Sequence, residues 1–156
     1  IIDYGAGNHT SVWQAMHSLG YRCRVSHDPE VLDETDLLML PGVGAFPKAM
    51  QGLHKHNLPE YLQEKARQGK PFVGLCLGMQ LMAELSHEQG KTAGLGLIPG
   101  EVVPFQQVRW HIGWNSIEAK MAAISSSSLF TTSSTEVSLK WCFTKWVSKL
   151  PDLKAS

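Results

Sequence analysis

One cysteine of this sequence has the surroundings of a reactive thiol. Cys76 stands in Gly74-Leu75-Cys76-Leu77-Gly78, between an apolar run and a helical pattern. A small residue two positions before and two after a nucleophile is typical of a nucleophile elbow, here with cysteine in place of serine. A thiol at the start of a helix is favoured as the reactive thiolate, and the Leu77 amide is a natural oxyanion donor. We predict that Cys76 is a nucleophile; the alternative is an inert core cysteine.

A glycine-containing loop is the second segment that suits chemistry. Pro41-Gly42-Val43-Gly44 follows the apolar run Leu37-Leu38-Met39-Leu40. In a parallel sheet such a loop lies at the carboxyl edge of the strands, where ligands bind, and its glycines let backbone approach a substrate closely. Taken alone, the loop is better interpreted as an ordinary turn between a strand and a helix.

The elements that must position these segments alternate along the chain. Expected strands are residues 1–2, 21–25, 37–40, 72–75, 101–103 and 110–117, and expected helices are 8–19, a short one after Asp28, 48–56, 59–68 and 77–85. Alternating strands and helices predict a three-layer α/β sandwich with a mostly parallel sheet. From Ala119 the composition turns rich in Ser and Thr. We therefore predict a domain over residues 1–118 and a divergent tail over 119–156, disordered or frameshifted.

The bulk composition narrows the classes of function. A formal net charge of +0 gives no electrostatic footprint for nucleic acid or an anionic membrane, and no apolar run approaches the roughly 20 residues of a membrane span. Three cysteines without paired spacing favour a reducing, cytoplasmic location over a disulfide framework. No metal or cofactor site is expected. The chain opens on Ile1 rather than Met, so we expect that the natural start lies upstream.

Five segments occur in an order that points to one family. They are Ile1–Asn8, Pro41–Phe46, Lys70–Leu81, Gly94–Gly100 and His111–Asn115. Together they closely resemble the class I glutamine amidotransferases, and among these the glutaminase subunit of imidazole glycerol phosphate synthase in histidine biosynthesis. The resemblance covers residues 1–118, and the cysteine elbow alone is shared by other members of the class.

The resemblance implies a role for individual residues. Cys76 would attack the carboxamide of glutamine and form a glutamyl thioester, with oxyanion contacts from the Leu77 amide and from the loop. In that loop the matching positions are Gly42, Val43 and Gly44, and Gln80 matches a residue that positions glutamine. Asn8, Trp114 and Asn115 match positions that face a (β/α)8-barrel cyclase subunit, which uses the ammonia. Blander readings remain: Gln80 as a solvated helix residue, Asn8 as a helix cap, and Trp114 as core.

The sequence departs from the family where a general base is needed. Family members carry a Phe-His-Pro-Glu motif near the C-terminus, whereas none of the seven histidines here follows His111 and none precedes Pro-Glu. Without that His and Glu, we expect this chain to be an impaired glutaminase. The first alternative is a non-catalytic remnant or binding partner of the synthase barrel. The second is another thiol enzyme on an α/β-hydrolase-like fold.

Overall fold

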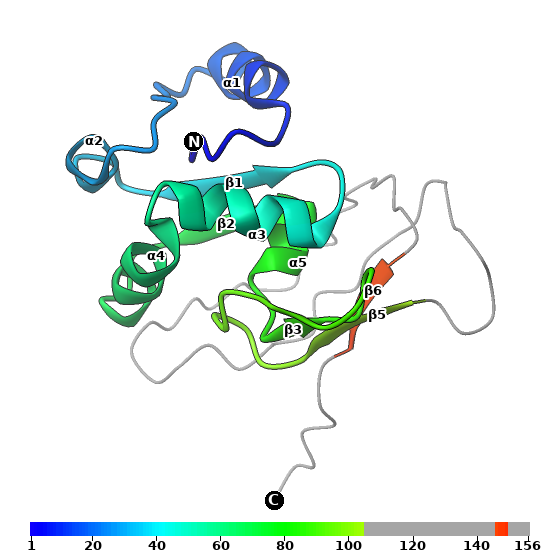
Figure 1. The fold of residues 1–156 in the computed structure, drawn as a ribbon. Helices are drawn as coiled ribbons and strands as arrows, with labels where there is room; N and C mark the ends of the chain where they lie inside the picture. Colours follow the sequence, from blue (N-terminus) through cyan, green and yellow to red (C-terminus); the bar gives the residue numbers. More distant parts are fainter. Residues whose placement is uncertain (105–145, 150–156) are drawn as a thin grey trace, which may run out of the picture. The chain divides into compact units, whose positions relative to one another are not determined.

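The computed structural model describes residues 1–104 and the backbone of the strand at 146–149 (Figure 1). Its central feature is the parallel pair β1 (Leu38–Gly42) and β2 (Phe72–Cys76), in a register that sets Leu38 beside Phe72 and Gly42 beside Cys76. The first residues of the chain continue the sheet on the other side of β1. There the Ile2 amide donates to the Met39 carbonyl at 2.8 Å, and Ile2 forms a parallel bridge with Ser26. The predicted α/β fold with a parallel sheet is confirmed.

A second sheet contains the short strands β3 (Leu85–Ser86), β4 (Thr92–Ala93), β5 (Glu101–Pro104) and β6 (Trp146–Lys149), in the order β4-β3-β5-β6. β3 runs antiparallel to β4 and parallel to β5. β6 belongs to the predicted tail. The rest of the tail, and the strand predicted at 110–117, lie outside the described residues.

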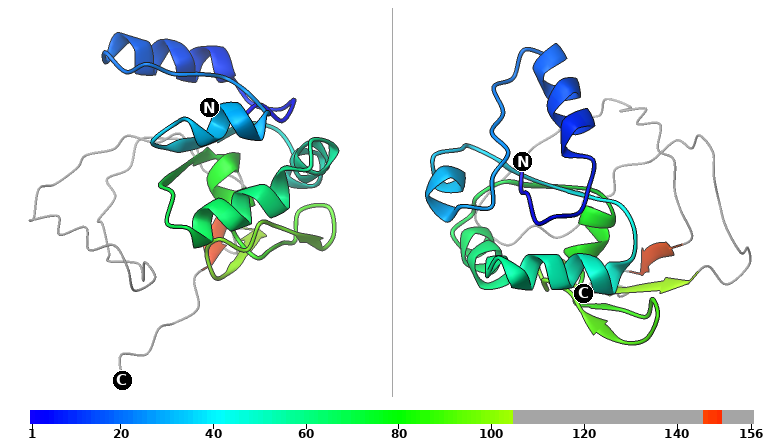
Figure 2. Two further views of the ribbon diagram at one scale, coloured as in Figure 1. Left: turned by 90° about the vertical axis from the view of Figure 1, so that its left-hand side faces the viewer. Right: turned by 45° about the horizontal axis from the view of Figure 1, so that its top comes forward.

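The described helices are α1 (His9–Ser18), α2 (Pro29–Asp33), α3 (Phe46–Lys55), α4 (Leu58–Arg67) and α5 (Leu77–Leu81). α1 lies on one side of the β1–β2 pair, and α3 and α5 lie on the other (Figures 1 and 2). The caps follow the sequence signals, since the side chains of Asn8 and Asp28 accept from the backbone amides of Ser11 and Glu30. No helix of the described residues is long and apolar enough to cross a membrane.

The core lies between β1 and the helices α3, α4 and α5. All five residues of β1 are buried, as the continuous apolar run predicted. Largest among the fully buried side chains are Tyr4, Phe46, Ile2, Leu32, Leu38, Leu40, Leu53, Leu58, Leu62, Leu81, Leu95 and Val102. By contrast β2 is only half-buried along its length, although its sequence predicted a buried strand. In the described part of the chain β1 is the only strand that pairs with β2, which leaves the other edge of β2 without a described neighbour.

The helix predicted over residues 77–85 is shorter than expected. α5 ends at Leu81, and residues 85–86 form the strand β3 instead. The cause is competition for carbonyl groups: the Leu95 amide donates to the Leu81 carbonyl at 2.8 Å, and the Leu97 amide donates to that of Met82 at 2.8 Å. A helix continuing past Leu81 would need those same carbonyls for its own amides.

The region around α1 also differs from its sequence pattern. The predicted strand 21–25 does not form, and only Ser26 bridges to the N-terminal segment. α1 forms as predicted, but none of its residues is buried, and Leu19 just beyond it is 70% exposed. The helical spacing of apolar residues thus predicts the helix correctly here, but it does not predict whether the helix is buried.

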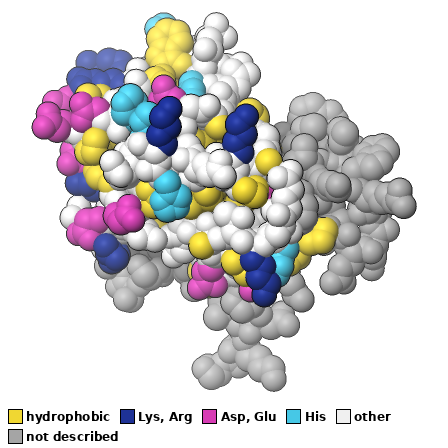
Figure 3. Space-filling model, viewed as in Figure 1, with side chains coloured by type: hydrophobic (Ala, Val, Ile, Leu, Met, Phe, Trp, Pro, Cys, Tyr) yellow, Lys and Arg dark blue, Asp and Glu magenta, His cyan; other side chains and the backbone are white. Residues whose placement is uncertain are grey.

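The face shown in Figure 3 carries both acidic and basic side chains, without an extended patch of either sign. This distribution agrees with the zero formal net charge of the sequence.

Candidate active site

Cys76 lies at the sharp turn between β2 and α5. Its backbone has φ 55° and ψ −118°, a left-handed conformation that non-glycine residues rarely adopt. Strained residues of this kind persist where the surrounding structure over-determines them, and they cluster at functional sites. The side chain is half-buried and the thiol is free. The geometry is that of a nucleophile elbow, as the Gly-Leu-Cys-Leu-Gly segment predicted.

The two glycines that bracket the cysteine are required by sterics. A Cβ added to Gly74 would lie 2.5 Å from the Met79 Cα atom. A Cβ added to Gly78 would lie 1.7 Å from the Leu40 carbonyl oxygen. Neither glycine has a positive φ. Both are needed because the backbones of β2, α5 and β1 meet here without room for a side chain.

The loop after β1 lies beside this turn. Gly42 pairs with Cys76 in the parallel register, so the start of the predicted substrate loop and the thiol share the carboxyl edge of the sheet. A Cβ on Gly42 would lie 2.6 Å from the Gly78 amide nitrogen and 2.9 Å from the Leu77 Cβ. Val43 is 57% exposed, and Gly44 has φ 101°, a value that favours glycine. The proximity that the sequence predicted is therefore present.

A tyrosine that the sequence analysis did not select contacts the same loop. Tyr4 is 1% exposed, and its hydroxyl donates to the Pro41 carbonyl oxygen at 2.7 Å. Burial, and then the negative charge of the neighbouring Cys76, raise the pKa of Tyr4 well above its usual value. The phenol is therefore a neutral hydrogen-bond donor at the edge of the site. A buried aromatic residue is normally interpreted as core, so no spacing signal marked Tyr4.

Comparison with known proteins identifies the family. Residues 1–136 match the family described as Glutamine amidotransferase class-I. The chain belongs to this family.

Individual amidotransferases support the assignment. Imidazole glycerol phosphate synthase subunit HisH of Lactococcus lactis subsp. lactis (strain IL1403) is 46% identical over 125 residues, covering 79% of this chain and 62% of that protein. HisH of Aquifex aeolicus (strain VF5) is 46% identical over 120 residues, covering 75% and 58%. A crystal structure of a glutamine amidotransferase shares the fold with a TM-score of 0.60 at 17% identity, covering 74% of this chain and 63% of that one. The chain thus spans about 60% of the length of the HisH proteins it matches.

Two further positions carried over from the amidotransferase resemblance are described. Gln80 is 4% exposed in α5, so it is not the solvated helix residue of the blander reading. Asn8 caps α1 by accepting from the Ser11 amide at 3.1 Å, which accounts for its side chain without a partner subunit. Trp114 and Asn115 lie outside the described residues.

The histidines of the described residues do not reproduce the amidotransferase triad. His87 has its Nε2 atom 2.7 Å from the Glu101 carboxylate, but this pair joins β3 and β5 on the surface. His9 has a buried Nε2 with no hydrogen-bond partner among residues 1–104. Those same residues contain no group of three or more His, Cys, Asp or Glu side chains that could hold a metal ion.

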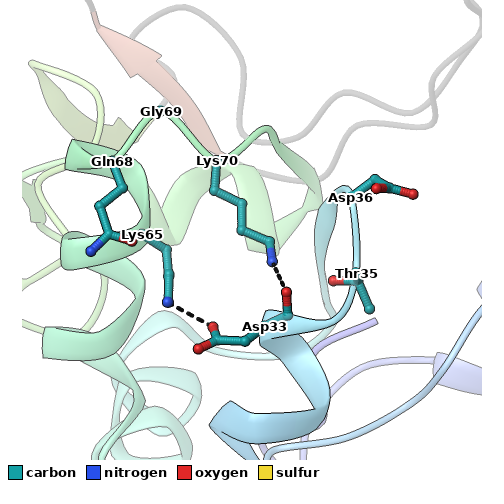
Figure 4. A pocket seen from close by; sticks show the side chains of 7 residues that line it. All are labelled: Asp33, Thr35, Asp36, Lys65, Gln68, Gly69 and Lys70. Atoms are coloured by element: carbon teal, nitrogen blue, oxygen red, sulfur yellow. Dashed lines mark hydrogen bonds and ion pairs between the residues drawn. The ribbon is translucent and has the colours of Figure 1, made fainter.

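Two hollows of the amidotransferase domain lie away from Cys76. One, shown in Figure 4, is lined by Asp33, Thr35, Asp36, Lys65, Gln68, Gly69 and Lys70. There Lys65 Nζ lies 2.8 Å from an Asp33 carboxylate oxygen, and Lys70 Nζ donates to the Leu32 carbonyl at 2.9 Å at the end of α2. These contacts tie α2 to α4, and they have a structural role. The other, of about 1020 Å³, is lined by residues 1, 13, 16–17, 21–24, 34–37 and 39.

Proposed function

We propose that this chain provides the glutaminase of an imidazole glycerol phosphate synthase. It takes ammonia from glutamine and passes it to a (β/α)8-barrel cyclase subunit in a heterodimer. The observation that carries the proposal is Cys76, held in a left-handed conformation beside Gly42 at the carboxyl edge of a parallel sheet. The names of the HisH relatives support the choice of synthase. The family match favours this reaction over a thiol enzyme of the α/β-hydrolase type.

The chemistry follows from the position of the thiol. Sulfur attacks the carboxamide carbon of glutamine, a carbon–sulfur bond forms, and the carbonyl electron pair moves to oxygen. The Leu77 amide and the backbone of Gly42, Val43 and Gly44 are the donors we assign to that oxyanion. Collapse breaks the carbon–nitrogen bond, and the nitrogen takes up the proton that the thiol gave up and leaves as ammonia, which leaves a glutamyl thioester on Cys76. Water then hydrolyses the thioester to glutamate and the free thiol. Buried Gln80 is assigned to glutamine positioning.

Proton transfer is the weak point of this chain. Ammonia leaves only when the nitrogen is protonated, and a positioned general acid or base contributes about 10²–10⁴-fold to such steps. The sequence contains no histidine after His111 and no His-Pro-Glu segment. We propose that the 156-residue polypeptide forms the thioester slowly and turns over little, even with the barrel subunit present.

The test separates thioester formation from turnover. The purified 156-residue chain is incubated with glutamine, alone and with a (β/α)8-barrel cyclase subunit, and glutamate release is followed while mass spectrometry detects adducts on Cys76. We expect a glutamyl adduct on Cys76 and turnover at least about 10²-fold below that of an intact glutaminase. The adduct must vanish in Cys76→Ala and persist in Cys23→Ala. Absence of any adduct would overturn the nucleophile assignment, and robust turnover would show that another residue, with His111 examined first, supplies the base.

A second function, docking without catalysis, is favoured by the same missing base. In that case the chain binds the cyclase subunit through Asn8, Trp114 and Asn115, the positions that the family resemblance assigns to the partner. The Cys76→Ala variant would then bind the subunit as tightly as the unmodified chain, while Trp114→Ala would bind it more weakly. The free thiols of Cys23 and Cys76 fit the reducing cytoplasm that we propose as the location of either complex.

A further inference from the structure

The N-terminal segment Asp3–Asn8 encloses one backbone carbonyl. The Pro41 oxygen accepts the Tyr4 hydroxyl at 2.7 Å, and a Cβ added to Gly7 would lie 3.3 Å from that same oxygen. Gly7 has φ 115°, so glycine is needed there both for conformation and for space. The segment therefore contacts the end of β1 in two ways: Tyr4 donates a hydrogen bond to the Pro41 carbonyl, and Gly7 packs closely against it.

The Tyr4 ring itself is held in place. It is 1% exposed, and a Cβ added to Gly52 of α3 would lie 2.4 Å from the Tyr4 carbonyl oxygen and 3.2 Å from its ring. α3 thus approaches Tyr4 as closely as backbone allows. Because the Tyr4 side chain is confined in this way, its hydroxyl occupies one position. Forming the hydrogen bond therefore costs the side chain little additional conformational entropy.

That position adjoins the nucleophile. A Cβ added to Gly42 would lie 2.9 Å from the Tyr4 hydroxyl oxygen, 2.9 Å from the Leu77 Cβ and 2.6 Å from the Gly78 amide nitrogen. Gly42 is also the register partner of Cys76. The hydroxyl, the loop and the first turn of α5 therefore converge on one point.

We propose that Tyr4 is a positioning residue, which fixes the Pro41–Gly42 peptide so that the following loop amides face the oxyanion formed at Cys76. This inference rests on the proposed thiol chemistry and adds a residue to it. Gly42 is the last residue of β1, so the hydrogen bond from Tyr4 to the preceding carbonyl holds this peptide at the point where the strand ends and the loop begins. Without the Tyr4 hydroxyl, the loop amides are still present but no longer held facing the oxyanion.

Two reagents that lack any glutamine-like group separate this role from substrate recognition. With 4-nitrophenyl acetate, the Cys76 sulfur adds to the ester carbon, the carbonyl pair forms an oxyanion, and 4-nitrophenolate leaves with the electron pair of the broken carbon–oxygen bond. With iodoacetamide, the sulfur–carbon bond forms as iodide departs with its electron pair, and no oxyanion develops. The ratio of the two rates at Cys76 therefore reports oxyanion stabilisation alone. Failure of the chain to use glutamine would not change that ratio.

The experiment compares Tyr4→Phe with the matched control Tyr61→Phe, whose hydroxyl donates to the exposed Asp33 carboxylate. Site-resolved mass spectrometry gives both rates in the full 156-residue chain. Removing an oxyanion donor costs about 10²–10³-fold, so a misaligned one should lower the acylation-to-alkylation ratio about tenfold in Tyr4→Phe. Tyr61→Phe should leave the ratio unchanged. A ratio within twofold of the unmodified chain, or parallel changes in both rates, would overturn the proposal. Unfolding of Tyr4→Phe alone would also overturn it, by showing a purely structural role.

Discussion

The strained backbone of Cys76 should reveal itself as stored free energy when the residue is replaced by glycine. A non-glycine residue in a left-handed conformation costs about 1–3 kcal/mol, and glycine adopts φ 55° without that cost. Alanine removes the thiol but keeps the Cβ and hence the strain. We expect Cys76→Gly to be more stable than Cys76→Ala, which reverses the usual order of these two residues.

The magnitude follows from opposing contributions. Strain release favours glycine by about 1–3 kcal/mol, while the greater freedom of glycine in the unfolded chain opposes it by about 0.4–1 kcal/mol. The half-buried Cβ lost from Cys76 is worth less than the roughly 0.8 kcal/mol of a fully buried methylene. The balance is about 1 kcal/mol in favour of glycine, or roughly 2–4 °C in melting temperature for a chain of this size.

The assay is urea unfolding of four variants. Cys23 is also a half-buried free cysteine, but its φ is not positive, so Cys23→Gly should be less stable than Cys23→Ala by about 0.4–1 kcal/mol. The two sites should therefore show opposite signs with the same chemistry of substitution. If Cys76→Gly proves less stable than Cys76→Ala, the elbow holds no strain and the reasoning from its backbone is wrong.

Three further outcomes can be checked by unfolding experiments. Gly78→Ala should destabilise the chain by more than about 3 kcal/mol because its Cβ overlaps a carbonyl, whereas Gly90→Ala, with open space and φ 111°, should lose only about 1 kcal/mol. Glu88→Ala should cost about 1 kcal/mol, because the carboxylate accepts the Phe46 amide at the start of α3, and Glu88→Gln should recover most of that loss. Hydrogen bonds from lysine and tyrosine hold the pKa of Asp33 below its usual value, so the stability it contributes is present above pH 4 and is lost as pH falls through the lowered pKa. The midpoint of urea unfolding should consequently vary less between pH 6 and pH 3 in Asp33→Asn than in the unmodified chain.

The sequence was most informative where local sterics and chemistry point the same way. Glycines at 74 and 78 predicted the elbow, and the structure shows why both are needed, since each position is filled by backbone of another element. The continuous apolar run of β1 likewise predicted its burial. The Asn8 cap followed from residue type alone.

Competition from tertiary hydrogen bonds explains why α5 is shorter than predicted. Nothing near Leu81 in the sequence signals that amides from Leu95 to Ile98 will take the carbonyls a longer α5 would need. Tyr4 was missed for a similar reason, because its partner is the carbonyl of Pro41, 37 positions away. Every residue has a backbone carbonyl, so the sequence does not mark this one as a partner, and the pair becomes visible only in the folded structure.

The short α5 also determines how the molecule opens. Its last carbonyl, that of Leu81, accepts the Leu95 amide, and the carbonyl of Met82 just beyond it accepts the amides of Leu97 and Ile98. The Gly94 amide donates to the Glu84 carbonyl at 2.9 Å. The helix that follows the nucleophile and the turn at 94–98 therefore cannot separate without breaking these bonds together. We therefore expect them to form one cooperative unit in hydrogen exchange, with amides that exchange at a common free energy of opening. Loosening the turn should then also weaken the helix that follows Cys76.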